Sequence, residues 1–104
     1  MSLLSLFGFG NSKIKEALRN GAEVIDVRTA YEFDSGHVPN SINIPVDRIS
    51  VNVERIKDMK KPVIFCCATG NRSGQAADIM KANGFHEVFN GGSWENVIRL
   101  VNKL

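Results

Sequence analysis

The chain has 104 residues, 43% of them hydrophobic, which suffices for one hydrophobic core and is too short to divide into two domains. Its 13 basic and 11 acidic residues give a formal charge of +2 and form no run of like charges, so nucleic acid is not expected as a partner. The two cysteines, Cys66 and Cys67, are adjacent, which disfavours an internal structural disulfide, and the two histidines stand at no zinc-ligand spacing, so no metal site is expected.

The first ten residues are apolar. They lack the basic flank of a signal peptide and have only about half the apolar length that a membrane-spanning helix needs. We interpret residues 1–10 as an N-terminal arm for packing or docking and residues 11–104 as the domain. No membrane span is expected, and a cytoplasmic location is the default, with a periplasmic one as the alternative if a signal peptide was removed.

Helical and strand patterns alternate along the rest of the chain. Helical spacing of apolar residues, with plausible caps, predicts helices over 13–20 (N-cap Asn11 or Ser12), 29–35, within 46–59, over 73–83 and over 93–104. Short apolar or β-branched runs predict strands at 23–27, 41–45, 62–66 and 87–89. Because the connections are too long for hairpins, we expect an α/β fold in three layers. A central, mostly parallel sheet of about four to five strands, with the run at 62–66 in its centre, would carry helices on both faces.

The candidate chemistry follows the most apolar strand, in the segment Cys67-Ala68-Thr69-Gly70-Asn71-Arg72-Ser73. Ligands of open parallel sheets bind beyond the carboxyl ends of the strands. Loop amides, the N-terminus of the next helix and Arg72 are expected to stabilise the Cys67 thiolate and make it nucleophilic. Gly70 permits a positive φ. Strand alternation points Cys66 into a packed face, where we expect an inert thiol.

These residues resemble the rhodanese-like domain family over about residues 22–92. The family pattern C-x-x-G-x-R, followed by Ser or Thr, reads here as residues 67–73. Two further blocks match in order: the D-V-R and E-F residues at 26–28 and 32–33, and the G-H-V-P and N-I-P residues at 36–39 and 43–45. A closing pair of glycines stands at 91–92.

The resemblance implies a rhodanese-like fold and a sulfurtransferase that needs no cofactor. Cys67 would take sulfane sulfur from thiosulfate or a low-molecular-weight persulfide, hold it as a persulfide, and pass it to a thiol, to cyanide or to an acceptor protein. Residues 68–73 would bind the substrate. Since Ala68 and Thr69 are not basic, Arg72 is the one obvious cation for the sulfonate of thiosulfate.

Three other matched residues are expected to support the site. For Asp26 and Arg28 we expect a structural role, through hydrogen bonds to loops or a local pair with Glu32. The ring of His37 is expected to be satisfied by backbone groups rather than to act as a general base.

Two alternatives remain open. The chain could be a sulfur carrier or interaction module without turnover, with the N-terminal arm as a docking segment. It could instead be a cysteine phosphatase or arsenate reductase. Those loops enclose five residues between Cys and Arg, whereas Cys67 and Arg72 enclose four, which favours a smaller anion site.

Overall fold

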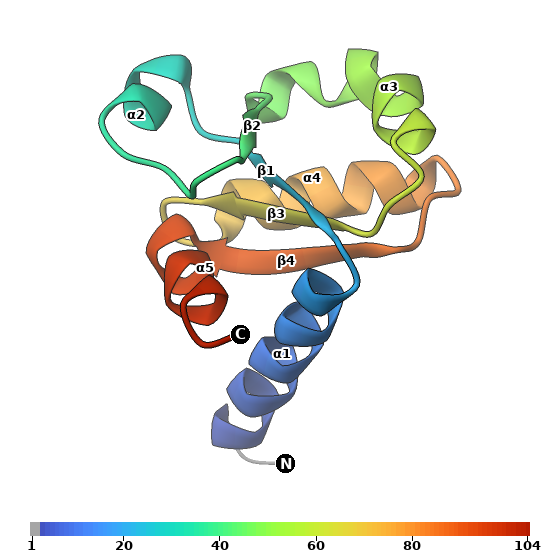
Figure 1. Ribbon diagram of the computed structural model, residues 1–104. Helices are drawn as coiled ribbons and strands as arrows, with labels where there is room; N and C mark the ends of the chain where they lie inside the picture. The colour runs from blue at the N-terminus through green and yellow to red at the C-terminus, as the bar shows by residue number, and fades with distance from the viewer. Residues whose placement is uncertain (1–2) are drawn as a thin grey trace.

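The computed structural model describes the backbone of residues 3–104 and the side chains from Gly10 onward (Figure 1). The helices are α1 (Leu3–Arg19), α2 (Ala30–Asp34), α3 (Val53–Asp58), α4 (Asn71–Ala82) and α5 (Trp94–Val101). Two 3-10 turns, η1 (Val46–Arg48) and η2 (Ser50–Asn52), lead into α3. The strands are β1 (Glu23–Asp26), β2 (Ile42–Asn43), β3 (Val63–Cys67) and β4 (Val88–Ser93).

The four strands form one parallel sheet in the order β2-β1-β3-β4. Strand β3 therefore lies inside the sheet, as the apolar run at 62–66 predicts. The register pairs Asp26 of β1 with Cys66, and Ser93 of β4 with Cys67. The carboxyl ends of the three longer strands thus meet at one edge of the sheet, where parallel α/β folds place their ligands.

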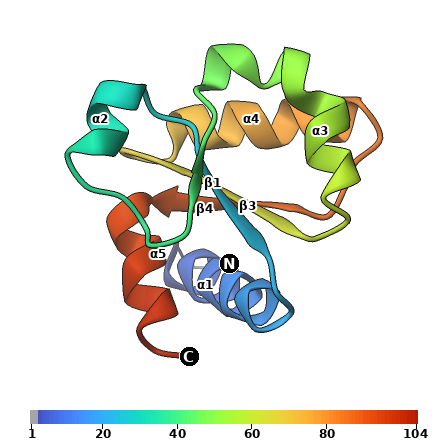
Figure 2. The ribbon, with the colours of Figure 1, turned by 45° about the horizontal axis from the view of Figure 1, so that its top comes forward.

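Helices cover both faces of the sheet, with α3 and α4 on one side and α1 and α5 on the other (Figure 2). The residues of β3 alternate between these two layers. Phe65 and Cys67 pack into the core under α3 and α4, whereas Ile64 and Cys66 pack into the core under α1 and α5. The expected three-layer α/β fold, with a sheet of four strands, is confirmed.

The first helix starts earlier than predicted. It begins at Leu3, so the expected start near residue 13, with Asn11 or Ser12 as N-cap, is wrong. No proline interrupts residues 3–12, and the helix continues upstream of Ile14 and Ala17, which anchor it in the core. Residues 1–2, and the side chains up to Phe9, lie outside the described part, so the arm's docking role stays a prediction.

Three other boundaries differ from the expected ones. Strand β2 has only two residues, and β4 runs through Ser93 rather than ending at Phe89. Helix α4 starts at Asn71 instead of Ser73. The cap of α5 is confirmed, since Ser93 Oγ accepts a hydrogen bond from the amide of Asn96. Among the described helices, none combines the length and apolar character that crossing a bilayer requires.

Candidate active site

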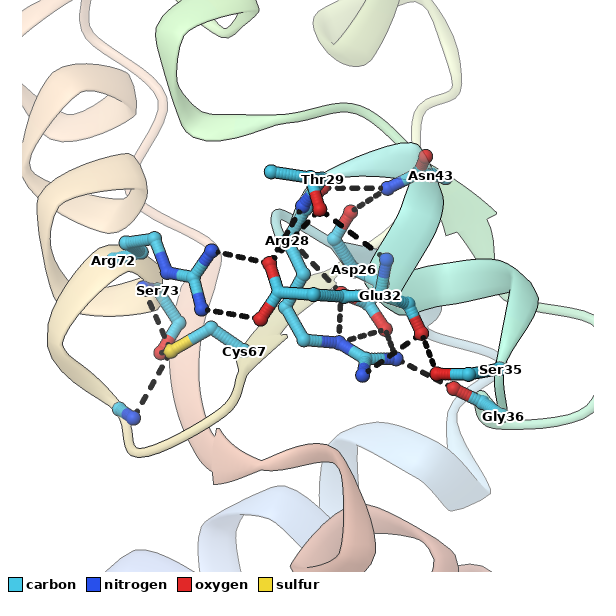
Figure 3. Close-up of polar contacts among 11 residues, drawn as sticks. Asp26, Arg28, Thr29, Glu32, Ser35, Gly36, Asn43, Cys67, Arg72 and Ser73 are labelled. Carbon is cyan, nitrogen blue, oxygen red and sulfur yellow. Dashed lines mark hydrogen bonds and ion pairs between the residues drawn. The ribbon is translucent and has the colours of Figure 1, made fainter.

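Cys67 is the last residue of β3, and its thiol lies beneath the turn that leads into α4 (Figure 3). The sulfur accepts a hydrogen bond from the amide of Gly70 at 3.0 Å and a longer one from the amide of Ser73 at 3.4 Å. Gly70 has φ of +104°, a conformation that favours glycine and that turns its N–H back toward the sulfur. The predicted amide-lined site is therefore present, and the Cys67 sulfur itself occupies it.

Two opposing effects act on the Cys67 thiol. Burial raises its pKa, because the residue is only 1% exposed. Hydrogen bonds from the Ser73 hydroxyl and from the amides of Ser73, Gly70 and Thr69 favour the thiolate, and together they outweigh burial. The pKa of Cys67 is lowered below its ordinary value, so the thiolate is more populated at neutral pH than in an ordinary cysteine.

The hydroxyl of Ser73 has two neighbours that compete for its single hydrogen. It lies 3.3 Å from Cys67 Sγ and donates to Asn90 Oδ1 at 2.7 Å. Asn90 also accepts from the amide of Gly92 and donates to the carbonyl of Gly70, so its amide group joins the end of β4 to the active loop. The sequence carried no signal for this role of Asn90, whose two partners in the loop are 17 and 20 residues away.

Arg72 donates no hydrogen bond to Cys67, so the stabilisation of the thiolate expected from Arg72 would act through its charge alone. Its guanidinium forms a two-pronged ion pair with Glu32 of α2, at 2.7 and 3.0 Å. The bond to Arg72 is the main reason that the pKa of Glu32 falls to about 2. Glu32 also closes a capping box with Thr29 at the start of α2. The pair therefore ties α2 to the first turn of α4.

Asp26 and Arg28 form a buried ion pair at the end of β1, with a shortest distance of 2.7 Å. Arg28 also donates to the backbone carbonyls of Glu32 and Gly36, and its guanidinium lies 4.8 Å from the ring centre of Trp94. The expected hydrogen bonds to loops are present. The expected side-chain pair with Glu32 is not, because the Glu32 carboxylate binds Arg72 instead.

The side chains of the remaining predicted site residues make no hydrogen bond to the Cys67 thiol. His37 is exposed, its Nδ1 lies 2.7 Å from the carbonyl of Phe33, and its ring stacks on the Phe33 ring at 3.7 Å. The expected backbone partner of His37 is thus observed. Ala68, Thr69 and Asn71 are exposed and uncharged.

A hollow of about 780 Å³ borders the outer side of this turn. It is lined by residues of the loop, α1, β4 and α5, and Arg99 gives it one positive charge. Cys67 does not line this hollow, because its side chain points into the opposite layer of the domain.

Cys66 contrasts with its neighbour. It is fully buried in the core under α1 and α5. Burial, with a further contribution from the nearby Asp26 carboxylate, raises the pKa of Cys66 far above its ordinary value. Cys66 therefore lacks the thiolate character that reactivity requires. Within the described part of the chain, no three His, Cys, Asp or Glu side chains are grouped to hold a metal ion.

These features define a class of protein: an α/β domain whose activated thiol lies in an amide-lined loop at the carboxyl end of a central parallel strand. A sequence model described as the rhodanese-like domain matches residues 11–98. The thiosulfate sulfurtransferase GlpE of Pseudomonas savastanoi is 36% identical over 75 residues, covering 71% of this chain and 70% of that protein. The chain belongs to the rhodanese-like domain family.

Two further matches agree with this membership. The protein YqhL of Bacillus subtilis is 38% identical over 69 residues, which cover 66% of this chain and 54% of the relative. This chain thus spans about half the length of that relative. The solved structure of a rhodanese with anions from E. coli superposes with a TM-score of 0.66 at 30% identity, over 72% of this chain and 89% of the other.

Proposed function

We propose that the protein is a sulfurtransferase that carries sulfane sulfur as a persulfide on Cys67. The observation that supports this most directly is the set of hydrogen bonds on Cys67 Sγ, which lower the pKa of a thiol that burial alone would keep protonated. Membership of the rhodanese-like family, and similarity to a relative named thiosulfate sulfurtransferase, support the same chemistry.

The reaction proceeds in two displacements. The Cys67 thiolate attacks the outer sulfur of the donor, an S–S bond forms to Cys67, and the donor's own S–S bond breaks with its electron pair. Sulfite leaves from thiosulfate, or a thiolate leaves from a persulfide. An acceptor thiolate or cyanide then attacks the outer sulfur and releases the Cys67 thiolate. Because Cys67 is 1% exposed, each displacement requires the turn at residues 68–70 to move aside.

Mass spectrometry of the intact protein tests the first displacement. Wild type, Cys67→Ser and Cys66→Ser are incubated with thiosulfate and, separately, with glutathione persulfide. Wild type and Cys66→Ser are expected to gain the mass of one sulfur atom, which cyanide removes, whereas Cys67→Ser gains none. Cys66→Ser is the matched control because it removes a buried thiol that lies in the other core. Failure of both donors to load wild type would contradict the proposal and favour an interaction module.

A further inference from the structure

The formal charges around the active loop cancel in pairs. Arg28 is neutralised by Asp26, and Arg72 is neutralised by Glu32 through two hydrogen bonds of 2.7 and 3.0 Å (Figure 3). These four side chains therefore add no net charge to the approach to Cys67. A site built to attract a doubly charged anion would leave its arginine free to bind that anion.

Arg72 is nevertheless placed to influence Cys67. It stands in the first turn of α4, one residue before Ser73, whose amide bonds the sulfur. Its side chain is 32% exposed, so the guanidinium is accessible to solvent beside the loop. The pKa of Arg72 is raised chiefly by the hydrogen bond to Glu32 and, to a smaller extent, by the charge of Cys67.

We propose that Glu32 sets the charge selectivity of this site. By neutralising Arg72, its carboxylate removes the attraction that a free guanidinium would exert on a dianion. The site then disfavours thiosulfate, with two negative charges, relative to donors of lower charge such as an alkyl persulfide. The proposal rests on the sulfurtransferase function proposed above and names its donor class.

The variant Glu32→Gln removes the charge of the side chain with the smallest change in its shape. Glutamine has the same length, retains an oxygen that accepts from Arg72, and is a suitable capping-box residue at the same position of α2. The negative charge is lost together with one of the two bonds from Arg72, because the amide nitrogen of glutamine cannot accept it. Glu87→Gln is the matched control, because it removes the same charge at an exposed residue just before β4. In a parallel sheet, that position lies at the edge opposite Cys67.

The charge effect can be measured without sulfur chemistry. Cys67 is alkylated with iodoacetate, an anion, and with neutral iodoacetamide, and the ratio of the two rates is taken. Loop opening and the thiolate fraction affect both reagents equally, so they cancel in the ratio. We expect this ratio to rise about threefold in Glu32→Gln at low salt and to fall back as salt is added.

The controls identify the source of the effect. The ratio should stay at the wild-type value in Glu87→Gln and return to it in the double variant Glu32→Gln/Arg72→Gln. A ratio unchanged in Glu32→Gln would overturn the proposal and leave Glu32 with a purely structural role. A ratio that remains raised in the double variant would also overturn it, because Arg72 would not be the source.

Donor kinetics then test the donor class. In Glu32→Gln, the KM for thiosulfate should fall about threefold or more with kcat unchanged, and the KM for a simple alkyl persulfide, which carries at most one negative charge, should change less. Equal changes in KM for the two donors would overturn the proposed charge selectivity. If no donor loads any variant while the alkylation ratio still rises, the sulfurtransferase function and the donor assignment fail, and control of charge at Cys67 by Glu32 stands.

Discussion

At the scale of single residues, the reactivity of Cys67 depends on donors that persist when the thiol loses its proton. The amides of Gly70 and Ser73 are held toward the sulfur by the turn and by α4, so they favour the thiolate as long as the turn is closed. The Ser73 hydroxyl is different, because its one hydrogen also serves Asn90 Oδ1 at 2.7 Å. Ionisation of Cys67 attracts that hydrogen toward the sulfur, since hydrogen bonds to charged groups are stronger than neutral ones.

The substitution Ser73→Ala tests this contribution. Loss of the hydroxyl removes one donor to the thiolate while the Ser73 amide stays in place, so the pKa of Cys67 should rise. Alkylation by iodoacetamide at neutral pH should slow by about tenfold or more, the effect of one hydrogen bond to a charged group worth about 1.5 kcal/mol or more. The rate is measured against pH, and its midpoint should move to higher pH with the same plateau. A lower plateau with an unmoved midpoint would instead indicate a change of loop access.

At the scale of elements, the Glu32–Arg72 pair joins α2 to α4, two helices that are neighbours in neither sequence nor sheet order. Helix α2 has five residues and buries none of them, so its own packing contributes little. It is held by its capping box, by the two carbonyl bonds from Arg28, and by the pair with Arg72. The position of α2 beside the active loop therefore depends on polar contacts.

This dependence predicts a loss of stability in acid. The pKa of Glu32 is about 2 in the folded protein and 4.5 for the free side chain. A lowered carboxyl pKa contributes stability that is present above 4.5 and lost as pH falls toward 2. Between these pH values, wild type should lose more unfolding free energy than Glu32→Gln. Urea denaturation across that pH range measures the unfolding free energy of both proteins. Parallel plots of unfolding free energy against pH would contradict the lowered pKa of Glu32.

The elements were predicted from sequence with uneven success, for physical reasons. The runs at 23–27 and 62–66 give strands within one residue of their observed ends, because β-branched and apolar residues there pack on both faces. Strand β4 extends through Gly91 and Gly92, which carry no strand signal. A Cβ on Gly91 would lie 2.8 Å from side-chain atoms of Ile64 and Val97, so close packing of the layers selects glycine.

The candidate site was likewise predicted only in part from the sequence. Cys67, Gly70 and the amide-lined turn could be read from sequence because they are contiguous and follow a central strand. The partner of Arg72 could not, since 40 residues separate it from Glu32. Local spacing suggested Arg28 as a partner for Glu32, but Arg28 is held by Asp26, two residues away and fully buried. Tertiary packing therefore decides which carboxylate each arginine pairs with.

At the scale of the whole molecule, the active loop is held by a strand with packed layers on both sides. All five residues of β3 are buried, and Phe65 is the largest fully buried side chain of the described residues. Small domains have total stabilities of about 5–15 kcal/mol. Truncating one large buried side chain of β3 should therefore remove a substantial part of the unfolding free energy of the domain. The same strand positions Cys67.

Phe65→Ala should destabilise the domain by about 3–5 kcal/mol. Tyr31→Ala is the matched control, because Tyr31 is an aromatic residue that is 87% exposed, and its change should stay within about 0.5 kcal/mol. Both are measured by urea denaturation at neutral pH. Similar losses in the two variants would contradict the assignment of the core.

Repeated acceptance and release of sulfur by Cys67 is tested most directly by thiocyanate formation under multiple turnover. Cyanide and a persulfide donor are supplied in large excess over the protein, and product is counted per mole of chain. Wild type and Cys66→Ser should form many equivalents, and Cys67→Ser should stay at the uncatalysed rate. A yield that stops at one equivalent would identify a sulfur carrier without turnover. Equal rates for wild type and Cys67→Ser would contradict the role of Cys67.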